Sequence, residues 1–427
     1  MTMDGAVVLV LLAATGSLVA HLGLAVFNDG VRATARIAVA THEGRKATAK
    51  QAARLAGPSV FGFGAVMSVL SGLLNPFLLL LPTDAIGLRS TRRWLAVVLG
   101  ACWGAAAVAG VFGLHRALES VDHSPMPYLG TLADALVLML PFFPAIAAAE
   151  QLGRLRGAAV LGGVVAATVV VARTGETGAS MWLPLILGVG LYLVLLVPTF
   201  RQAHREQGPR PGASPFAELQ AANSARLRRA LPLLMVLGAL TSAACYLQVY
   251  GGSEVSLFLL ADGDVGGAAM LDGFRALGYL PLIVMVAMAS GTYGAAGLTL
   301  VYPVGYLSPN LATAAVLGAL VIAIEVCLLS RANEVAMRYP CIRTTTDHLR
   351  NALYTTLELG LSGGCLLIAA QSLGAVGFAL VGGLFMVNEA LGRPVIRMAA
   401  APSALLITVV LLNLVPPEAF VSMLGRS

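Results

Sequence analysis

The stretch GLLNPFLLLLPTDAIG (Gly72–Gly87) is apolar, but an Asn-Pro pair and a Pro-Thr-Asp sequence interrupt it. It ends a longer apolar run, Gly57–Gly87, which has basic segments on both sides. In a membrane protein, Lys and Arg are retained on the cytoplasmic side, so both ends of this run should lie on the same face. Two full helical crossings need about 40 residues, more than the run contains. The run therefore predicts a re-entrant hairpin that turns near Asn75-Pro76.

The composition places the rest of the chain in a bilayer as well. Hydrophobic residues make up 58% of the 427 residues and charged residues 11%, whereas soluble domains have roughly 45–50% and about 25%. A single soluble core could not bury so much apolar surface, which excludes a soluble enzyme, a disordered chain and a nucleic-acid-binding protein. The formal net charge of +6 then reflects the orientation of the chain in the membrane rather than affinity for nucleic acid.

Apolar runs of about 20 residues are the sequence signal of transmembrane helices. A further short crossing is expected within Ser290–Ser308, where Gly and Pro would break a regular helix. The half-polar segment Asn28–Ala56 predicts an amphipathic helix along the inner membrane surface. Besides the hairpin, the predicted spans are Gly5–Phe27, Trp94–Leu114, Tyr128–Ala149, Gly157–Ala172, Ala179–Phe200, Leu231–Tyr250, Phe274–Gly291, Leu311–Ser330, Leu353–Ala370, Ala375–Ala390 and Ala399–Leu414.

A basic cytoplasmic linker is predicted at Arg201–Ala230, which contains the hinge-like sequence GPRPGASP. It would join an N-terminal membrane half, residues 1–200, to a C-terminal half, residues 231–427. Because the first half has five full spans, which is an odd number, the second half would have the opposite orientation in the membrane.

The second half also has an interrupted segment, Gly251–Asp272, directly after its first span. The part Gly251–Gly266 matches Gly72–Gly87 at five of sixteen positions. We therefore predict an all-α polytopic membrane protein with about 11–12 transmembrane helices, two re-entrant hairpin-like segments and an inverted repeat. Inverted repeats with interrupted helices recur in transporters.

Polar residues beside the interrupted helices are the predicted substrate-binding groups, because broken helices expose backbone N–H and C=O groups that bind charged ligands. The alternative interpretation is that these side chains only cap helices. The candidate residues are Asn75, Thr83, Asp84, Ser253, Glu254, Ser256 and Asn310.

Three ionisable residues inside predicted spans, His21, Glu325 and Glu358, are candidates for coupling to protons or cations. Interhelical hydrogen bonds or structural ion pairs are the alternative for each of them. Two clusters at helix ends predict a cytoplasmic polar network that could bind a carboxylate or phosphate. Its members are Asp29, Arg32, Asn388, Glu389 and Arg393.

The sequence contains no catalytic signature such as GxSxG, HExxH or Walker A. The five cysteines form no CxxC pair and lie mostly in apolar runs, so they are interpreted as buried space-fillers. We therefore expect neither an enzyme nor a metal site, and no cofactor.

The chain resembles the YhfT family of bacterial inner-membrane proteins, which are regarded as transporters or permeases. The resemblance covers essentially the whole chain and implies transport of a small organic solute, because relatives tend to be encoded among enzymes of small-metabolite breakdown. The matching stretches, in order, are AHLGLAVFNDGVR (Ala20–Arg32), GLLNPFLLLLPTDAIG, GSEVSLFLL (Gly252–Leu260), YLSPN (Tyr306–Asn310), RNA (Arg350–Ala352) and NEALGRPVIRMAA (Asn388–Ala400).

The leading hypothesis is a multi-pass transporter of the bacterial inner membrane that is coupled to an ion gradient. It would carry a small polar or anionic metabolite by alternating access. One alternative is the membrane subunit of a sugar phosphotransferase-type system, and another is a membrane scaffold that transports nothing. The expected partners are the small-molecule solute and the lipid bilayer, with a second copy of the chain or a small cytoplasmic protein as further options and no nucleic acid.

Overall fold

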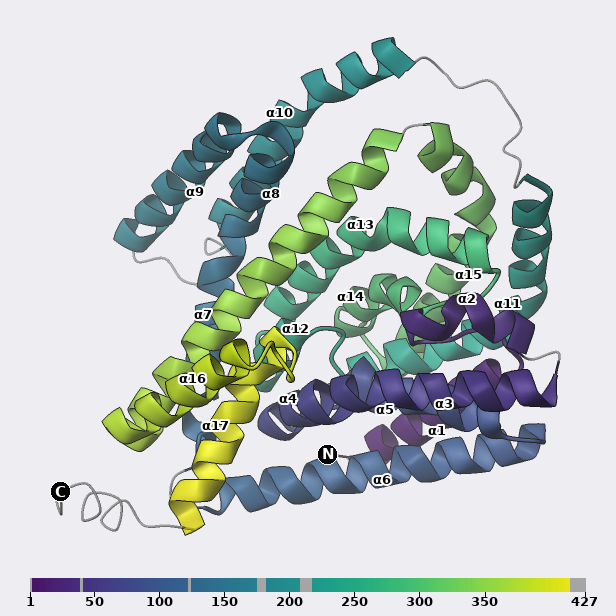
Figure 1. Ribbon diagram of the computed structural model, residues 1–427, viewed down its shortest axis with the longest axis horizontal. Coiled ribbons are helices and arrows are strands. Elements are labelled where there is room, and N and C mark those ends of the chain that lie inside the picture. Colours follow the sequence, from purple (N-terminus) through teal and green to yellow (C-terminus); the bar gives the residue numbers. More distant parts are fainter. Residues whose placement is uncertain are drawn as a thin grey trace.

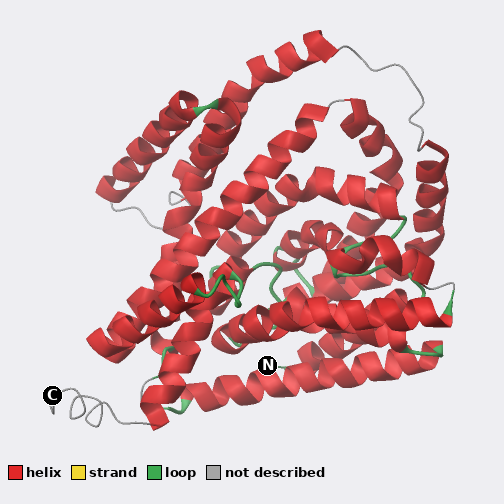
Figure 2. Ribbon diagram, viewed as in Figure 1, coloured by secondary structure: helices red, strands yellow, loops and turns green. Residues whose placement is uncertain are grey.

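The computed structural model describes residues 2–38, 41–121, 124–174, 182–207, 217–338 and 340–414. Within these ranges the regular secondary structure is helical and there is no strand (Figure 2). Nine of the described helical segments are long and apolar enough to cross a membrane. The chain is thus an all-α polytopic membrane protein, as predicted.

Three helices of the first half pack closely through small residues: α1 (Met3–His21), α5 (Pro76–Arg89) and α6 (Arg93–Glu119). A Cβ added at Gly87 would lie 2.8 Å from the His21 amide nitrogen, and one at Gly100 would lie 2.8 Å from the Ala13 carbonyl oxygen. Close approach of backbones at small residues is the usual way that helices pack in a membrane. Figure 1 shows α6 running alongside α1 at the edge of the molecule.

A hairpin is present with its turn at Gly72–Asn75, but it begins at His42 rather than Gly57, and its first arm is long enough to cross a membrane. That the hairpin is re-entrant stays a prediction. Its first arm is a 30-residue helical segment, His42–Ser71, made of α3 (His42–Ser59), a π-helical turn η1 (Val60–Gly64) and α4 (Ala65–Ser71). At 1.5 Å per residue, this arm is about 45 Å long. The second arm, α5, begins beside η1, where the Asn75 side-chain amide donates to the Gly64 carbonyl oxygen at 3.3 Å, and then packs along α3.

The two ends of the hairpin meet at one end of the molecule, as the basic flanking segments predicted. The Arg45 guanidinium, near the start of α3, donates to the His21 carbonyl oxygen at 3.1 Å. The His21 ring in turn contacts the Gly87 carbonyl oxygen near the end of α5 at 3.2 Å. The hairpin therefore enters and leaves on the same side of the fold.

The prediction of one surface helix over Asn28–Ala56 is wrong. A short helix, α2 (Asp29–Ala38), is followed by α3, which continues into the hairpin. Ala49, Ala52 and Ala56 are buried. Because these small side chains let α3 lie close against α5, this half-polar segment packs as a hairpin arm.

The remaining helices of the first half follow α6 in short steps. The turn η2 (Met126–Tyr128) leads into α7 (Leu129–Met139), the turn η3 (Leu140–Phe142) and α8 (Phe143–Leu152). After them come α9 (Arg154–Thr174) and α10 (Leu183–Gln207). In Figure 1, α8, α9 and α10 form a separate group beside the long diagonal helix α16.

The second half begins with α11 (Ala217–Tyr246), α12 (Glu254–Ala261) and α13 (Val265–Ser290). The 3₁₀ segment η5 (Ala295–Leu300) and α14 (Val301–Tyr306) follow, then α15 (Leu311–Arg338), α16 (Pro340–Ala390) and α17 (Arg397–Leu414). Gly374 has φ 65° and divides α16 into two arms, which correspond to the predicted spans Leu353–Ala370 and Ala375–Ala390. The predicted linker Arg201–Ala230 falls on the end of α10 and the start of α11, while GPRPGASP lies outside the described residues.

The two halves repeat the same order of elements. The helices α1, α2, α3–α4, α5 and α6 correspond to α11, α12, α13, η5–α14 and α15, and α7–α8, α9 and α10 correspond to the two arms of α16 and to α17. Positive φ angles recur at matching points, which are Gly23 (63°) with Gln248 (53°), Gly72 (71°) with Gly291 (66°), and Gly153 (93°) with Gly374 (65°).

The repeat also pairs the non-helical segments of the two halves reciprocally. The segment Leu22–Asn28 after α1 pairs with Gly291–Gly294, because the Val26 amide donates to the Tyr293 carbonyl oxygen and the Tyr293 amide donates to the Leu24 carbonyl oxygen, both at 2.9 Å. The hairpin turn pairs with Leu247–Ser253, because the Gly251 amide donates to the Leu74 carbonyl oxygen and the Leu74 amide to the Val249 carbonyl oxygen, both at 3.0 Å.

Under the correspondence of the halves, Leu24, Ala25 and Val26 match Val249, Tyr250 and Gly251, and Leu74 matches Tyr293. The two hydrogen bonds of one pairing therefore correspond to the two of the other. Each half supplies the segment after its first helix to one pairing and the turn of its broken helix to the other. Such an exchange is the signature of a two-fold relationship between equivalent units. We call the pairing of Leu22–Asn28 with Gly291–Gly294 the first crossing and that of Gly72–Asn75 with Leu247–Ser253 the second crossing.

The sequence alignment of the two hairpin-like segments is therefore wrong. The counterpart of Gly72–Gly87 in the second half is Gly291–Tyr306, the broken helix expected within Ser290–Ser308, although the two share only three of sixteen residues. The segment Gly251–Asp272 instead contains α12, a turn and the start of α13, and it corresponds to α2 and its flanks. The matches to Gly251–Gly266 are Gly and Leu, which an apolar chain rich in both produces by composition.

Candidate functional site

A cavity of about 160 Å³ lies between the two crossings. Its wall is built from the residues that follow each break: Phe27 and Asp29 at the start of α2, Pro76 and Phe77 at the start of α5, and Gly252 just before α12. The η5–α14 segment supplies Ala295, Ala296, Thr299 and Tyr302, and Arg275, Tyr279 and Tyr354 come from α13 and α16. Both repeats therefore contribute to one site.

Arg275 brings a positive charge to this cavity. Its Nη1 donates to the Gly252 carbonyl oxygen at 2.8 Å, and its guanidinium carbon lies 5.4 Å from the centroid of the Tyr279 ring. The Tyr279 hydroxyl is hydrogen-bonded to that of Tyr354. Contact with an aromatic face and a backbone carbonyl fixes the guanidinium while leaving it in the cavity wall.

The helices α2, α5 and α12 all begin at the crossings, so their N-termini surround this cavity. A helix N-terminus carries a partial positive charge from its exposed N–H groups. The acidic residue in the wall, Asp29, forms an ion pair with Arg32. Side chains already cap these ends, with Asp84 on the Phe27 and Asn28 amides, Asn75 at α5 and Ser253 at α12. Arg275 is therefore the group of the wall that is best suited to an anion.

Asp272 and Tyr306 hold the second crossing in place. The Gly252 amide donates to the Tyr306 hydroxyl oxygen at 2.8 Å, and that hydroxyl donates to Oδ2 of Asp272 at 3.0 Å. Asp272 is fully buried and lies one helical turn before Arg275. The carboxylate thus positions the segment of backbone that Arg275 also contacts.

Glu325 and Arg32 contact the first crossing. The Tyr293 hydroxyl donates to Oε2 of Glu325 at 2.9 Å, and Oε1 of this buried carboxyl group has no hydrogen-bond partner among the described residues. A Cβ added at Gly297 would lie 2.8 Å from that oxygen. The Arg32 guanidinium fills the space that a side chain at Gly294 would need.

The predicted hairpin residues Asn75, Thr83 and Asp84 are buried in structural contacts rather than in the cavity wall. Asn75 caps α5, since its Oδ1 accepts from the Leu78 amide at 2.9 Å. Thr83 donates to the Leu80 carbonyl oxygen at 2.6 Å. Asp84 accepts from the Phe27 amide at 2.9 and 3.1 Å and from the Asn28 amide at 2.7 Å, and so it anchors the segment of the first crossing. The capping alternative describes these residues best.

The predicted residues of the second half divide in the same way. Ser253 and Ser256 form a capping box at the start of α12, and the side chain of Glu254 lies outside the described part of the structure. Asn310 is exposed, and its Oδ1 accepts from the Thr313 amide at 2.8 Å at the start of α15. Asn310 therefore caps the start of α15 and does not line the cavity.

Of the three predicted coupling residues, Glu325 bonds to a crossing segment through its side chain, because it accepts from the Tyr293 hydroxyl. His21 is buried at the end of α1 with Arg45 and Gly87. Glu358 forms an ion pair with Arg397 at 3.7 Å, and Arg397 also pairs with Glu389 at 3.3 Å.

The predicted cytoplasmic network consists of two separate groups. Glu389 pairs with Arg393 at 3.0 Å, and Asn388 exchanges two hydrogen bonds with the backbone of Val395, so these residues close the turn between α16 and α17. Asp29 and Arg32 pair with each other at the first crossing instead. No contact between the groups occurs among the described residues.

Sequence reasoning missed the residues that line the cavity, above all Arg275, and the buried Asp272 beside it. A signal was available for Arg275, because it is one of the few arginines outside the basic loops and stands at the start of a predicted span. Asp272 stands three residues before it, which places both side chains on one face of a helix. The tyrosines Tyr279, Tyr293, Tyr302 and Tyr306 carry no such signal.

The fold and the cavity define an all-α polytopic membrane protein built from two structurally equivalent halves. The family model of YhfT, described as a protein of unknown function, matches residues 5–418. The chain is also 33% identical over 411 residues to the uncharacterized protein YhfT of Escherichia coli strain K12, with 93% of this chain and 94% of the relative covered. The chain belongs to the YhfT family. No solved structure matches it.

Proposed function

We propose that this chain is a secondary transporter of the bacterial inner membrane that carries a small organic anion by alternating access. The observation that carries the proposal is the cavity between the two reciprocal crossings. Broken helices that meet around a site, with half-helix N-termini directed at an anionic group, are a recurring plan of transporters. Arg275 would bind the charged group of the solute, and Tyr302 and Thr299 would contact the same group from the η5–α14 side of the cavity.

The charges of the loops support opposite orientations for the two halves. The loop after α5, Leu88–Arg93, contains three arginines, whereas its counterpart after α14, Leu307–Asn310, contains no Lys or Arg. Because Lys and Arg are retained on the cytoplasmic side, the first loop would face the cytoplasm and the second the periplasm. Movement of one half against the other would then open the cavity to either side in turn.

Glu325 is the coupling group that this proposal favours. It is buried, it holds the hydroxyl of Tyr293 in the first crossing, and one of its oxygens lacks a partner among the described residues. A proton or a small cation bound there would change the contact with the crossing segment. Ionisable residues inside membrane spans commonly mark ion pathways and proton relays.

Uptake into liposomes tests the proposal. Full-length protein would be reconstituted with an inward proton or sodium gradient, and uptake of labelled acetate, butanoate, succinate and glutamate would be measured. We expect at least one of these anions to accumulate, and we expect Arg275→Gln to abolish this while Arg275→Lys retains part of it. Arg116→Gln, outside the cavity wall, is the matched control.

The two alternatives give different results in the same assay. Uptake that requires phosphoenolpyruvate and soluble phosphoryl carriers would replace this proposal with a phosphotransferase-type permease. If correctly folded protein took up none of these anions under any gradient, the transport proposal would be wrong and a scaffold role would be favoured.

A further inference from the structure

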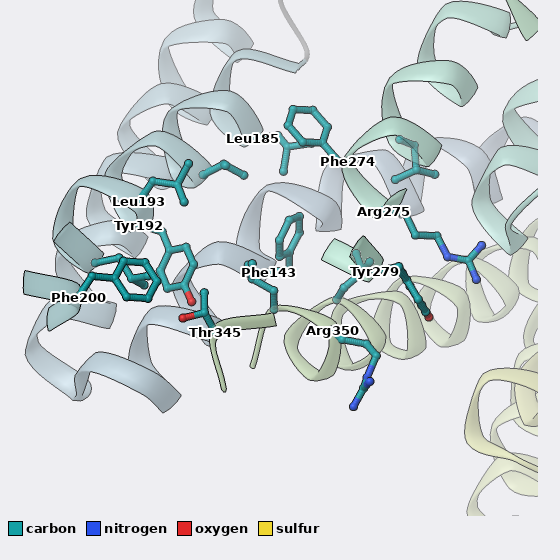
Figure 3. A pocket seen from close by; sticks show the side chains of 15 residues that line it. Phe143, Leu185, Tyr192, Leu193, Phe200, Phe274, Arg275, Tyr279, Thr345 and Arg350 are labelled. Carbon is teal, nitrogen blue, oxygen red and sulfur yellow. The ribbon is translucent and has the colours of Figure 1, made fainter. Parts of the chain in front are cut away.

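A second, larger cavity adjoins the central one. It has a volume of about 350 Å³ and lies among α8, α10, α13 and α16 (Figure 3). This volume is within the range of roughly 300–1,000 Å³ that is usual for small-molecule sites. The site brings together helices from both halves of the chain, and such boundaries are preferred positions for ligand pockets.

The wall of this larger cavity is predominantly apolar and aromatic. Phe143, Tyr192, Phe200 and Phe274 line it together with several leucines. Its hydroxyl groups are already engaged, because the Tyr192 hydroxyl is hydrogen-bonded to the Gln151 side chain and the Gln151 amide donates to the Thr345 hydroxyl oxygen at 2.7 Å. The interior therefore offers an environment for hydrocarbon rather than for a polar solute.

Two arginines belong to the wall of this cavity. In Figure 3 the Arg275 guanidinium lies to the right of Tyr279, the Arg350 guanidinium points downward from α16 and apart from it, and Tyr192 and Phe200 lie at the left. Arg350 is held by Asp347 at 3.1 Å. Arg275 and Tyr279 also line the central cavity, so the same guanidinium borders an apolar space on one side and a polar space on the other.

We propose that the solute is an amphipathic monocarboxylate whose carboxylate binds Arg275 in the central cavity and whose alkyl or aryl part occupies the apolar cavity among α8, α10, α13 and α16. This inference rests on the proposed function and adds the chemical class of the solute. A purely polar dicarboxylate would leave the apolar cavity empty and would desolvate its second charge without a partner. An alkyl part gains about 0.8 kcal/mol for each buried CH₂, which corresponds to about fourfold in affinity.

The test is a binding series on full-length protein in nanodiscs of phosphatidylcholine. Acetate, butanoate, hexanoate and octanoate would be compared with octanol, succinate and phosphatidylglycerol as competitors. We expect affinity to rise by about fourfold per CH₂ along the acids, and we expect octanol, which lacks the charge, to bind far more weakly than octanoate. Val189→Phe should fill part of the apolar cavity, lowering octanoate affinity by about tenfold and leaving butanoate affinity nearly unchanged. Val410→Phe, in a separate apolar groove, is the matched control and should change neither.

The possible failures of this inference and of the transport proposal are distinguishable. If uptake of acetate or succinate depends on Arg275 but affinity does not rise with chain length, this inference is overturned and the transport proposal stands. If phosphatidylglycerol displaces octanoate and no acid is taken up, the apolar cavity is a lipid site and both are overturned.

Discussion

Tyr293 joins the first crossing to Glu325, since its backbone pairs with Leu24 and Val26 while its hydroxyl donates to the Glu325 carboxyl group at 2.9 Å. A change at this carboxyl group therefore acts directly on a segment that borders the central cavity. Gly297 lies against the Tyr293 hydroxyl and the Glu325 carboxyl group. The Arg32 guanidinium, which pairs with Asp29, lies against Gly294 next to Tyr293.

The first prediction follows from that contact. Glu325→Gln keeps the shape of the side chain and can still accept from Tyr293, but it cannot change its charge. We expect this variant to lose accumulation driven by an ion gradient and to keep solute exchange between equal concentrations. Glu358→Gln, in the network with Arg397, should retain both activities, and equal loss in the two variants would count against a coupling role for Glu325.

The second prediction concerns the anchor of the first crossing. Asp84→Ala would leave the Phe27 and Asn28 amides without their acceptor, and each unpaired buried donor costs about 1–3 kcal/mol. We expect a marked fall in thermal stability in detergent, with a smaller fall for Asp84→Asn, which retains one acceptor oxygen. Asp262→Ala, at an exposed position, should have little effect. Unchanged stability of Asp84→Ala would show that the carboxyl group does not anchor this segment.

The third prediction concerns the left-handed backbone at the turns. Gly72→Ala and Gly291→Ala should each destabilise the protein by about 1–2 kcal/mol or more, because a side chain with positive φ is strained and a Cβ would meet His115 at 2.9 Å or Asn223 at 2.6 Å. Gln248→Gly, at the non-glycine position with φ 53°, should be neutral or stabilising. Melting temperatures in one detergent measure all three, and Gly110→Ala, which has open space, is the helical control.

Much of the fold could be predicted because its signals are local. Apolar length identified the spans, and the basic segments around Gly57–Gly87 required a hairpin whose turn the structure places at Gly72–Asn75. The matching of the two repeats could not be found in this way, because Gly72–Gly87 and Gly291–Tyr306 share a backbone path and few side chains. Each segment needs glycine at its left-handed first residue, and the rest of each segment has adapted to different neighbours.

The central cavity lies beside the breaks at which the sequence placed several of its candidate residues, but those residues do not line it. Polar side chains such as Asn75, Asp84 and Ser253 stand out in an apolar sequence, yet a buried polar side chain in a membrane must satisfy the backbone around it first. These residues therefore hold the breaks in place. Arg275 and the tyrosines of α13–α14 line the cavity, and only the three-dimensional packing of the crossings brings them together.

The orientation of the two halves is the most direct test of the account. Thr91, after α5, and its counterpart Asn310, after α14, are both exposed. In a background with the native cysteines replaced, Thr91→Cys and Asn310→Cys would be labelled from either side of inner-membrane vesicles with an impermeant maleimide. We predict that Thr91→Cys reacts only from the cytoplasmic side and Asn310→Cys only from the periplasmic side. Labelling of both positions from the same side would contradict the inverted arrangement and, with it, the alternating-access transporter.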